Sequence, residues 1–563
     1  MIQKSAARRP WHPLALLGVL ALWLATLGNL PLWRTVWQLP ETHGAHAPVM
    51  LGGLATLLLA FSLVVLALFV WPRWLKPAGL LLLAVSTASS YFMHAYGVVI
   101  DATMIGNMAH TNVREVRDLL SGGMLVALLL GVLLPGLWWW RQPLQAVPLR
   151  RLLPRQLGLA ALALMVTAAL GWASFQDLAS LMRNHRSLRY MINPYNTLYA
   201  AGRHALGRAA HAQQPLQPLG EDAVAPVAAT DAEHGPLLVL VVGETTRAAN
   251  FGLGGYARDT TPELRTLQQQ GQLVYFPQVR SCGTNTDVSV PCMFSHLGRA
   301  GVDRGERHEN LLDVLQRAGL AVLWLDNQSG CKGVCDRVPH ADTSSLAVPG
   351  LCDGQECHDE ILLRELPARL AALDPARRAR GTVVVLHQMG SHGPAYAKRT
   401  PAAHKPFQPE CASAALQDCP PGQLVNAYDN TVRYTDHVLA ETVRWLQAQP
   451  RPTALLYVSD HGESLGEKGL YLHGMPYSLA PEEQTHVPMV LWLSQAMRTQ
   501  LGLAPACLQQ AAAQPLAHDH LFHSVLHLAQ VQTRVQQPAL DVFAACTGAH
   551  RTQAALALPG AGG

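Results

Sequence analysis

The stretch Leu237-Leu-Val-Leu-Val-Val-Gly-Glu244 is a continuous apolar run that ends at a carboxylate. An uninterrupted run of this kind is typical of a strand that is buried on both faces of a sheet. Similar runs follow it, and helical patterns at 311–318 and 428–447 lie between them. The further runs cover 320–325, 382–386, 454–458 and 487–493. This alternation predicts an α/β domain with a central, mainly parallel sheet over residues 236–563.

Groups that could bind a metal follow two of these runs. Glu244 ends the first run, and Asp460 and His461 come just after the run at 454–458. Ligands of such sheets bind beyond the carboxyl ends of the strands, so the three side chains could meet at one edge. Taken singly, each is more often a polar group that ends a strand. Together, two carboxylates and a neutral imidazole predict a zinc site with a position left open for a reacting group.

A loop of hydroxyl residues between two cysteines is expected to supply that reacting group. Residues 281–295 read Ser-Cys-Gly-Thr-Asn-Thr-Asp-Val-Ser-Val-Pro-Cys-Met-Phe-Ser. A disulfide would hold a hydroxyl still here, and the residues after it are expected to enter a helix whose N-terminus favours anions. Metal coordination would lower the pKa of an otherwise weak hydroxyl nucleophile. From the residues alone Thr284, Thr286 and Ser289 are all candidates, and each could instead only cap the helix.

All ten cysteines lie after residue 281, within the expected α/β domain. An even number confined to one domain favours five disulfides, which persist only in oxidising compartments. The alternative is a reduced domain in which cysteines such as Cys331 and Cys335 bind zinc. In sequence order the close pairs are Cys282/Cys292, Cys331/Cys335, Cys352/Cys357 and Cys411/Cys419, with Cys507 and Cys546 left over.

The first 175 residues differ in composition from the rest of the chain. The whole protein is 49% hydrophobic and only 14% charged, and its apolar excess is concentrated here. Five stretches reach the roughly 20 residues that a helix needs to cross a bilayer: about 12–32, 48–71, 77–98, 119–140 and 156–175. We therefore predict a membrane domain with five spans over residues 1–175.

The distribution of basic residues predicts the orientation of these spans, because short loops rich in Lys and Arg are retained in the cytoplasm. Basic residues stand before the first span, between the second and third, and between the fourth and fifth. These sites share one side only if the N-terminus is cytoplasmic, which sends the α/β domain to the outer side, in agreement with the cysteines. The residues are Lys4, Arg8, Arg9, Arg73, Lys76, Arg141, Arg150, Arg151 and Arg155.

Residues 176–235 are expected to bridge the two domains. In 176–205, arginines stand among Leu, Met and Tyr, which is typical of an amphipathic segment along a membrane surface. Residues 206–235 are rich in Ala, Gln, Pro and Gly without apolar periodicity, as in a linker. The net charge is only +4, and no basic stripe is interleaved with aromatic residues. Nucleic acid is therefore not expected as a partner.

Six ordered blocks resemble the signature blocks of the lipid A phosphoethanolamine transferases, which belong to the alkaline phosphatase and sulfatase superfamily. The resemblance extends over nearly the whole chain, including the five spans. It implies a bacterial inner-membrane enzyme of the polymyxin-resistance type, with its zinc domain in the periplasm. The blocks are 243–247, 281–295, 326–333, 390–394, 459–464 and 473–477.

The resemblance also implies roles for individual residues. It selects Thr286 as the nucleophile, makes Glu244, Thr286, Asp460 and His461 the zinc ligands, and leaves room for a second zinc ion. Asn107, Thr111 and Glu115 recur every fourth residue, so a helix would place them on one face. That spacing alone fits a solvated face, whereas the resemblance assigns the three residues to the lipid substrate. The positions implied for the phosphoethanolamine group or a second zinc are Gln328, Ser329, Lys332, His392 and His473.

The implied reaction moves phosphoethanolamine from phosphatidylethanolamine, a membrane lipid, to a lipid A phosphate through a threonine intermediate, in a monomeric enzyme. A core sugar or a periplasmic glucan is an alternative acceptor. A phosphoglycerol transferase shares the five-span plan, but five cysteine pairs are not expected of it. A sulfatase would need Arg where Met293 stands, two positions after Pro291. A non-catalytic membrane sensor would have no reason to keep the four zinc ligands together.

Overall fold

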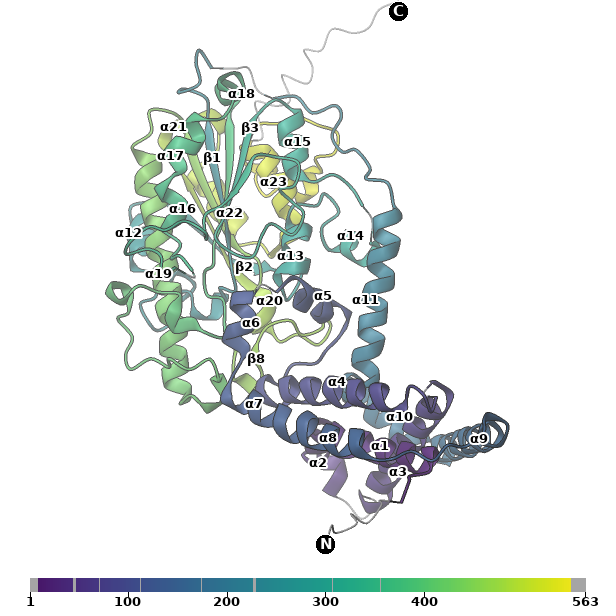
Figure 1. Cartoon of the computed structure of the whole chain (residues 1–563). Helices are drawn as coiled ribbons and strands as arrows, with labels where there is room; N and C mark the ends of the chain where they lie inside the picture. Colours follow the sequence, from purple (N-terminus) through teal and green to yellow (C-terminus); the bar gives the residue numbers. More distant parts are fainter. Residues whose placement is uncertain are drawn as a thin grey trace, which may run out of the picture. The chain divides into compact units, whose positions relative to one another are not determined.

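The computed structural model describes residues 9–43, 47–69, 71–111, 113–173, 175–225, 229–305, 307–354 and 356–547. The chain forms two compact units (Figure 1). The first consists of residues 1–105 and 120–205, and the second consists of residues 106–119 and 206–563. A short segment from within the expected membrane domain thus groups with the second unit.

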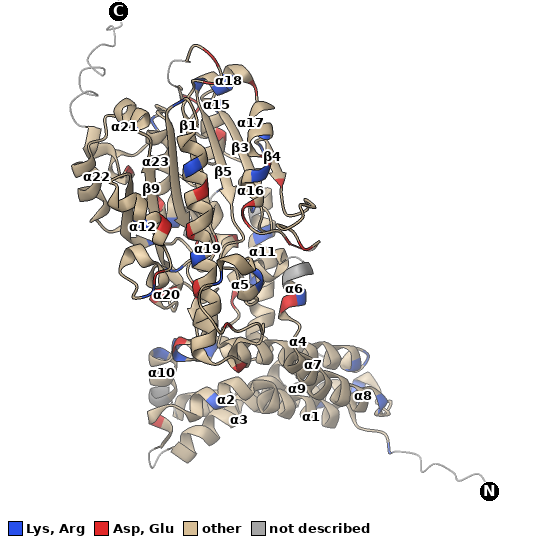
Figure 2. Ribbon diagram, turned by 90° about the vertical axis from the view of Figure 1, so that its left-hand side faces the viewer, with Lys and Arg blue, Asp and Glu red and all other residues tan. Residues whose placement is uncertain are grey.

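The first unit contains five helical stretches that are long and apolar enough to cross a membrane, which confirms the predicted spans. Charged residues are sparse along these helices and frequent in the second unit (Figure 2). A helix that is apolar all round is stable only in lipid or in a protein core. The spans are 13–37, containing α1 (Pro13–Ala25) and α2 (Leu30–Trp37); α3 (Ala47–Phe69); α4 (Leu75–Tyr96); 122–141, containing α7 (Gly122–Leu128) and α8 (Leu134–Arg141); and α9 (Leu149–Ala173).

The residues between the spans and the sheet are more helical than their composition suggests. α10 (Phe175–Asn184) and the first part of α11 (Tyr195–Gln213) lie in the stretch expected to be amphipathic. α11 then continues to Gln213, so the expectation of a linker from residue 206 is wrong for its first eight residues. Ala and Gln are good helix formers even without an apolar stripe. After the helix, Gln217 N donates to Arg307 O at 3.0 Å, a contact within the second unit.

The described residues of the second unit form an eight-stranded sheet with the order β10-β2-β9-β6-β1-β5-β3-β4. β9 is antiparallel to β2 and β6, whereas β1 is parallel to β5 and β6, and β3 is parallel to β4 and β5, so the mainly parallel sheet is confirmed. The bounds are β1 (Leu237–Gly243), β2 (Leu273–Arg280), β3 (Ala321–Asp326), β4 (His340–Asp342), β5 (Thr382–His387), β6 (Thr453–Ser459), β9 (His486–Leu493) and β10 (Leu516–Ala517).

Helices cover both faces of this sheet (Figure 1). In β1, Leu238, Leu240 and Val242 pack in one core, and the alternate residues Leu237, Val239 and Val241 pack in the other. This double burial is the reason for the uninterrupted apolar run. One face carries α13 (Thr286–Met293), α15 (Leu311–Arg317), α21 (Gln495–Leu501), α22 (Pro505–Ala512) and α23 (Leu521–Leu528); the other carries α12 (Pro262–Gln269), α16 (Ile361–Arg364), α17 (Leu366–Ala371) and α19 (Pro421–Gln447).

Shorter elements complete the second unit, together with five disulfides. The bonds Cys282–Cys292, Cys331–Cys335, Cys352–Cys357, Cys411–Cys419 and Cys507–Cys546 confirm the pairs that follow from sequence order. No cysteine is left free, so the alternative of cysteine-bound zinc is wrong. The remaining elements are α5 (Ala102–His110), α6 (Val113–Leu119), α14 (Gly298–Arg304), α18 (Pro375–Arg380), α20 (Glu482–Thr485), β7 (Ser464–Leu465) and β8 (Tyr471–Leu472).

Candidate active site

Glu244, Asp460 and His461 meet at the carboxyl ends of the central strands. Glu244 directly follows β1, and the other two follow β6, its neighbour in the sheet. One potential ligand atom from each side chain lies within 4.8 Å of the others, and all three residues are fully buried. The parallel pairing of β1 with β6 therefore brings together groups more than 200 positions apart in the sequence.

Thr286 is the hydroxyl that reaches this cluster. Asn285 accepts a hydrogen bond from Val288 N at 3.1 Å and caps α13, which places Thr286 in the first turn. Thr286 Oγ1 donates to Glu244 Oε2 at 3.0 Å and lies 3.4 Å from His461 Nε2.

The other two hydroxyl candidates make different contacts. Thr284 Oγ1 donates to the carbonyl oxygen of Met475 at 2.7 Å. The buried Ser289 Oγ has no hydrogen-bond partner in the described part of the chain. The tertiary structure therefore separates three hydroxyls that are equivalent in the sequence.

His461 is held in the form that binds a metal. Its Nδ1 lies 2.9 Å from the carbonyl oxygen of Gly462; a carbonyl only accepts, so Nδ1 carries the proton and Nε2 keeps its lone pair. Burial lowers the pKa of His461 to about 4, so the ring is neutral near pH 7. Nε2 lies 3.4 Å from both Glu244 Oε1 and Asp460 Oδ2.

The cluster fits a zinc ion in its chemistry. Asp460 Oδ1 accepts from the backbone N–H groups of Thr245 and His461 at 3.2 and 2.8 Å. Asp460 Oδ2 is buried without a hydrogen-bond donor among the described residues. Two carboxylates buried side by side are costly unless a cation compensates their charge. Two carboxylates, an imidazole nitrogen and a hydroxyl are donors that suit Zn²⁺.

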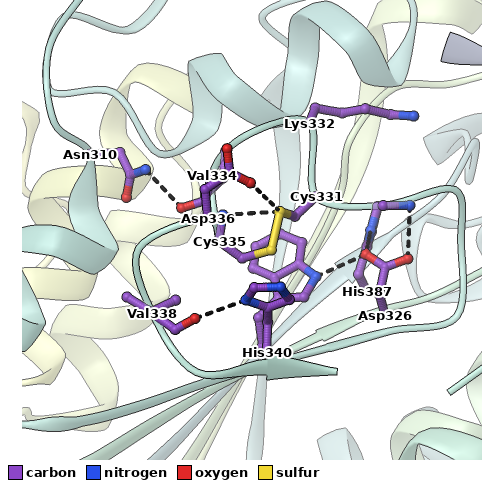
Figure 3. The surroundings of a disulfide bond; sticks show 12 residues. Asn310, Asp326, Cys331, Lys332, Val334, Cys335, Asp336, Val338, His340 and His387 are labelled. Atoms are coloured by element: carbon purple, nitrogen blue, oxygen red, sulfur yellow. Dashed lines mark hydrogen bonds and ion pairs between the residues drawn. A yellow bond between two sulfur atoms is a disulfide. The ribbon is translucent and has the colours of Figure 1, made fainter. Parts of the chain in front are cut away.

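A polar loop after β3 extends the site. Gln328 Nε2 donates to Glu244 Oε2 at 3.2 Å, Ser329 Oγ donates to Gln328 Oε1 at 2.6 Å, and Lys332 Nζ donates to Ser329 Oγ at 2.8 Å. The three residues line a cavity of ≈ 540 Å³. The disulfide Cys331–Cys335 closes the base of this loop, and Figure 3 shows the Lys332 side chain extending away from it. A cationic group is thus joined to the cluster through two polar side chains.

His392 and His473 lie beside the cluster. The His473 ring centroid is 4.4 Å from that of His461 and 5.8 Å from that of His392. Burial, reinforced by the charge of Arg399, lowers the pKa of His392 well below its ordinary value. His473 Nδ1 lies 3.3 Å from the buried Glu463, which orients the ring. The structure therefore brings both predicted histidines to the site.

The segment 106–119 contacts the rest of the second unit next to the expected nucleophile. His110 Nδ1 pairs with Asp287 Oδ1 at 2.6 Å, one residue after Thr286. Farther along the segment, the buried Asp118 pairs with Lys398 and with Arg399, the latter at 3.4 Å. These ion pairs attach the segment at two points to the rest of the second unit.

The one continuous helix expected for Asn107, Thr111 and Glu115 is not formed. α5 ends at His110 and α6 begins at Val113. Thr111 Oγ1 donates to the carbonyl oxygen of Asn107 at 2.8 Å, a bond by which threonine competes with helix continuation. The side chain of Glu115 lies outside the described residues.

Sequence reasoning missed two buried carboxylates that support the site. Glu463 orients His473, and its place in the block Asp460-His-Gly-Glu-Ser464 was an available signal. Asp359 accepts from Asn327 Nδ2, Met389 N and Gly390 N at 2.8, 2.8 and 2.9 Å, which joins the loops that follow β3 and β5. Burial raises the pKa of Asp359. It follows no strand and belongs to no block, so nothing in the sequence singled it out.

Comparison with known proteins shows the family to which the chain belongs. Residues 236–531 match the sulfatase family, and residues 58–208 match the family described as phosphoethanolamine transferase EptA/EptB. Phosphoethanolamine transferase EptA of Salmonella typhimurium is 38% identical over 557 residues, which are 97% of this chain and 99% of that protein. Phosphatidylethanolamine transferase Mcr-1 of Escherichia coli is 36% identical over 540 residues, or 93% of this chain and 96% of that protein.

A solved structure also matches nearly the whole length of the chain. It is the integral membrane protein lipooligosaccharide phosphoethanolamine transferase A (EptA) of Neisseria meningitidis, with a TM-score of 0.89 and 37% sequence identity over 94% of this chain and 98% of that one. The blocks, the five apolar spans, the sheet and these full-length similarities lead to one assignment. The chain belongs to the EptA-type phosphoethanolamine transferases, enzymes whose catalytic domain is of the sulfatase family.

Proposed function

We propose that this enzyme transfers phosphoethanolamine from phosphatidylethanolamine to a lipid A phosphate and thereby confers resistance to polymyxin. The observation that carries the proposal is the hydrogen bond from Thr286 to Glu244 inside the buried cluster with Asp460 and His461. The name of the relative Mcr-1 supports phosphatidylethanolamine as the donor. The name of the Neisseria meningitidis relative supports an acceptor in lipooligosaccharide, whose membrane anchor is lipid A.

The proposed location is the bacterial inner membrane, with a cytoplasmic N-terminus and a periplasmic catalytic domain. The five apolar helices and the basic residues on one side of them support this orientation. The five disulfides support an oxidising compartment for the catalytic domain.

In the first step, Thr286 Oγ1 attacks the phosphorus of the donor. The bond between Oγ1 and phosphorus forms, the bond between phosphorus and the glycerol oxygen breaks, and diacylglycerol leaves with a proton. Glu244 accepts the hydrogen bond of the attacking hydroxyl, and His461 lies within 3.4 Å of it. His473, held by Glu463, stands beside His461 and is placed to give the proton to the departing alkoxide.

Zinc held by Glu244, Thr286, Asp460 and His461 would lower the pKa of the threonine hydroxyl. The chain supplies the rest of the electrostatics. α13 begins at Thr286, so the positive end of its helix dipole favours the negative charge that develops on the phosphoryl oxygens. Gln328, Ser329 and Lys332 line the adjacent cavity and are proposed to bind the phosphate. A second zinc ion near His392 and His473 is part of the same proposal.

In the second step, a phosphate oxygen of lipid A attacks the phosphorus carried by Thr286, and the threonine regains its proton. Asn107, Thr111 and Glu115 are proposed to contact the lipid substrate. Support comes from the segment that carries them, because His110 pairs with Asp287 next to the nucleophile. The added amine reduces the negative charge of lipid A, which weakens its attraction for cationic peptides.

Mass spectrometry of lipid A tests this proposal. Bacteria that express the enzyme are expected to carry phosphoethanolamine on lipid A and to tolerate more polymyxin than cells with an empty vector. Detection of the group only on a core sugar or a periplasmic glucan would move the acceptor elsewhere. Unmodified lipid A in cells with verified membrane expression would contradict the assignment of the acceptor.

Lys332→Met is expected to weaken binding of the donor. The substitution keeps most of the side-chain volume but removes the cation beside Ser329. Hydrogen bonds to charged groups contribute about 1.5–3 kcal/mol, so KM for phosphatidylethanolamine should rise roughly 10- to 100-fold. Steady-state kinetics in detergent measure the change, with Lys405→Met as the matched control because Lys405 pairs with Glu410 instead. A KM equal to that of the wild type would remove Lys332 from the binding site.

A further inference from the structure

Glu360, His404 and His437 form a second group of metal-ligating side chains in the catalytic unit. One ligand atom from each lies within 4.8 Å of the others. Glu360 directly precedes α16, His404 ends a short 3-10 turn, and His437 lies within α19. None of them belongs to the active-site cluster. We propose that these residues bind Zn²⁺ at a site separate from the active site.

Hydrogen bonds orient two of the three ligands toward each other. The His437 ring lies between two carboxylates: Nδ1 is 3.0 Å from Glu263 Oε1 and can donate to it, so Nε2, which faces Glu360, is the nitrogen available to a metal ion. Glu360 Oε2 accepts from Tyr434 OH at 3.0 Å, which leaves Oε1 for a ligand. His437 Nε2 and Glu360 Oε1 are 3.7 Å apart. A carboxylate that fixes the distal nitrogen of an imidazole is the usual support of a metal-binding histidine.

The supporting carboxylate is itself held in place. Arg444 pairs with Glu263 Oε2 at 3.1 Å, so Oε1 remains directed to His437. The arrangement is thus a chain from Arg444 through Glu263 to His437.

His404 supplies the third donor. Its ring centroid lies 4.2 Å from that of His437, and in the described part of the chain no hydrogen bond to either of its ring nitrogens is found. All three ligand residues are only half-buried, so an ion can enter from solvent, and water can occupy a fourth position. Two imidazoles and a carboxylate with water are a common tetrahedral zinc shell.

Zinc bound here would fasten the segment after β5 to α19. That segment carries His392, and Arg399 Nε donates to the carbonyl oxygen of His392 at 2.9 Å. The segment also ends in the disulfide Cys411–Cys419. The inferred site is therefore structural, and it holds from the outside a segment whose inner end lies at the active site.

Zinc binding by the full-length protein in detergent tests the inference. After removal of metal with a chelator, the protein is titrated with Zn²⁺ alone, and bound zinc is measured by elemental mass spectrometry. An Asp460→Asn background weakens the active site, and His404→Ala is then added to it. The Asp460→Asn protein is expected to bind one zinc ion more than Asp460→Asn/His404→Ala. Equal zinc content in the two proteins would overturn the inference.

Two further variants make the result specific. Glu360→Gln keeps an acceptor for Tyr434 but removes the charged ligand, and it should weaken zinc binding at this site at least tenfold. His234→Ala, which removes an exposed histidine paired with Asp231, should bind as much zinc as its parent. Circular dichroism of the metal-free proteins verifies that each variant is folded. Unchanged zinc binding by folded Glu360→Gln would also contradict the inference.

Discussion

Thr286→Ala is expected to lower the rate of phosphoethanolamine transfer on the order of 10⁴-fold or more, because loss of a covalent nucleophile removes the first chemical step. Thr286 Oγ1 is the hydroxyl that donates to Glu244, and alanine leaves no atom in its place. The purified enzyme is supplied with phosphatidylethanolamine but no acceptor, and the intact protein is weighed by mass spectrometry. The wild type should gain the mass of one phosphoethanolamine group, and Thr286→Ala should gain none.

The two neighbouring hydroxyls provide matched controls for this experiment. Ser289→Ala removes a buried hydroxyl without a hydrogen-bond partner among the described residues, so it should not reduce stability. Thr284→Val loses a hydrogen bond to Met475 O, which costs about 1 kcal/mol of folding free energy. Both variants should still form the covalent adduct. Suppose instead that the Thr286→Ala protein still gained the mass of the adduct and that one of the two control variants did not. The residue replaced in that control variant would then be the nucleophile, and the assignment of Thr286 would be wrong.

Asp460→Asn is expected to remove zinc from the active site and to lower transfer roughly 10³-fold, the scale of losing a preorganised electrostatic contribution. The asparagine oxygen can still accept from Thr245 N and His461 N, so the loop keeps its backbone hydrogen bonds. What is lost is the charged Oδ2, which lies 3.4 Å from His461 Nε2. The zinc content of the purified protein measures the loss of the metal, and its transfer rate measures the loss of activity.

Asp541→Asn is the control for the loss of a buried carboxylate elsewhere. Asp541 pairs with His527 at 2.7 Å, and neither residue belongs to the active-site cluster. This variant should lose stability but retain both active-site zinc and activity when folded. If Asp460→Asn kept full zinc content and full activity, Asp460 would not be a ligand, and the proposed role of the cluster would be wrong.

Much of the fold could be predicted because its signals are local. The five apolar spans and five of the strands have continuous runs, since a helix in lipid or a strand covered on both faces excludes polar residues over its whole length. β2 lacks such a run, because Pro277 and Gln278 are exposed within it. α19 begins at Pro421, seven residues before the expected pattern, because its first turns are less buried than the remainder.

The active site could be predicted in part for a related reason. Parallel strands end at the same edge, so residues after β1 and β6 had to be neighbours. From the sequence, family resemblance alone selected Thr286 over Thr284 and Ser289. In the structure, the distinguishing feature is that the Thr286 hydroxyl faces Glu244. Asp359 connects two loops through three hydrogen bonds, and no pattern in the sequence indicates this role.

The sequence by itself determined the class of each part: a bundle of apolar helices, a disulfide-rich α/β domain and a loop that offers three candidate nucleophiles. Those properties depend on burial, length and pairing along short stretches of chain. Only the tertiary structure decided which distant side chains meet, as for Thr286 with Glu244, His110 with Asp287, and His404 with His437. The physical reason is that such contacts depend on how separate elements pack. The periodicity of residues within one element shows which of its faces is buried, but it does not show which other element packs there.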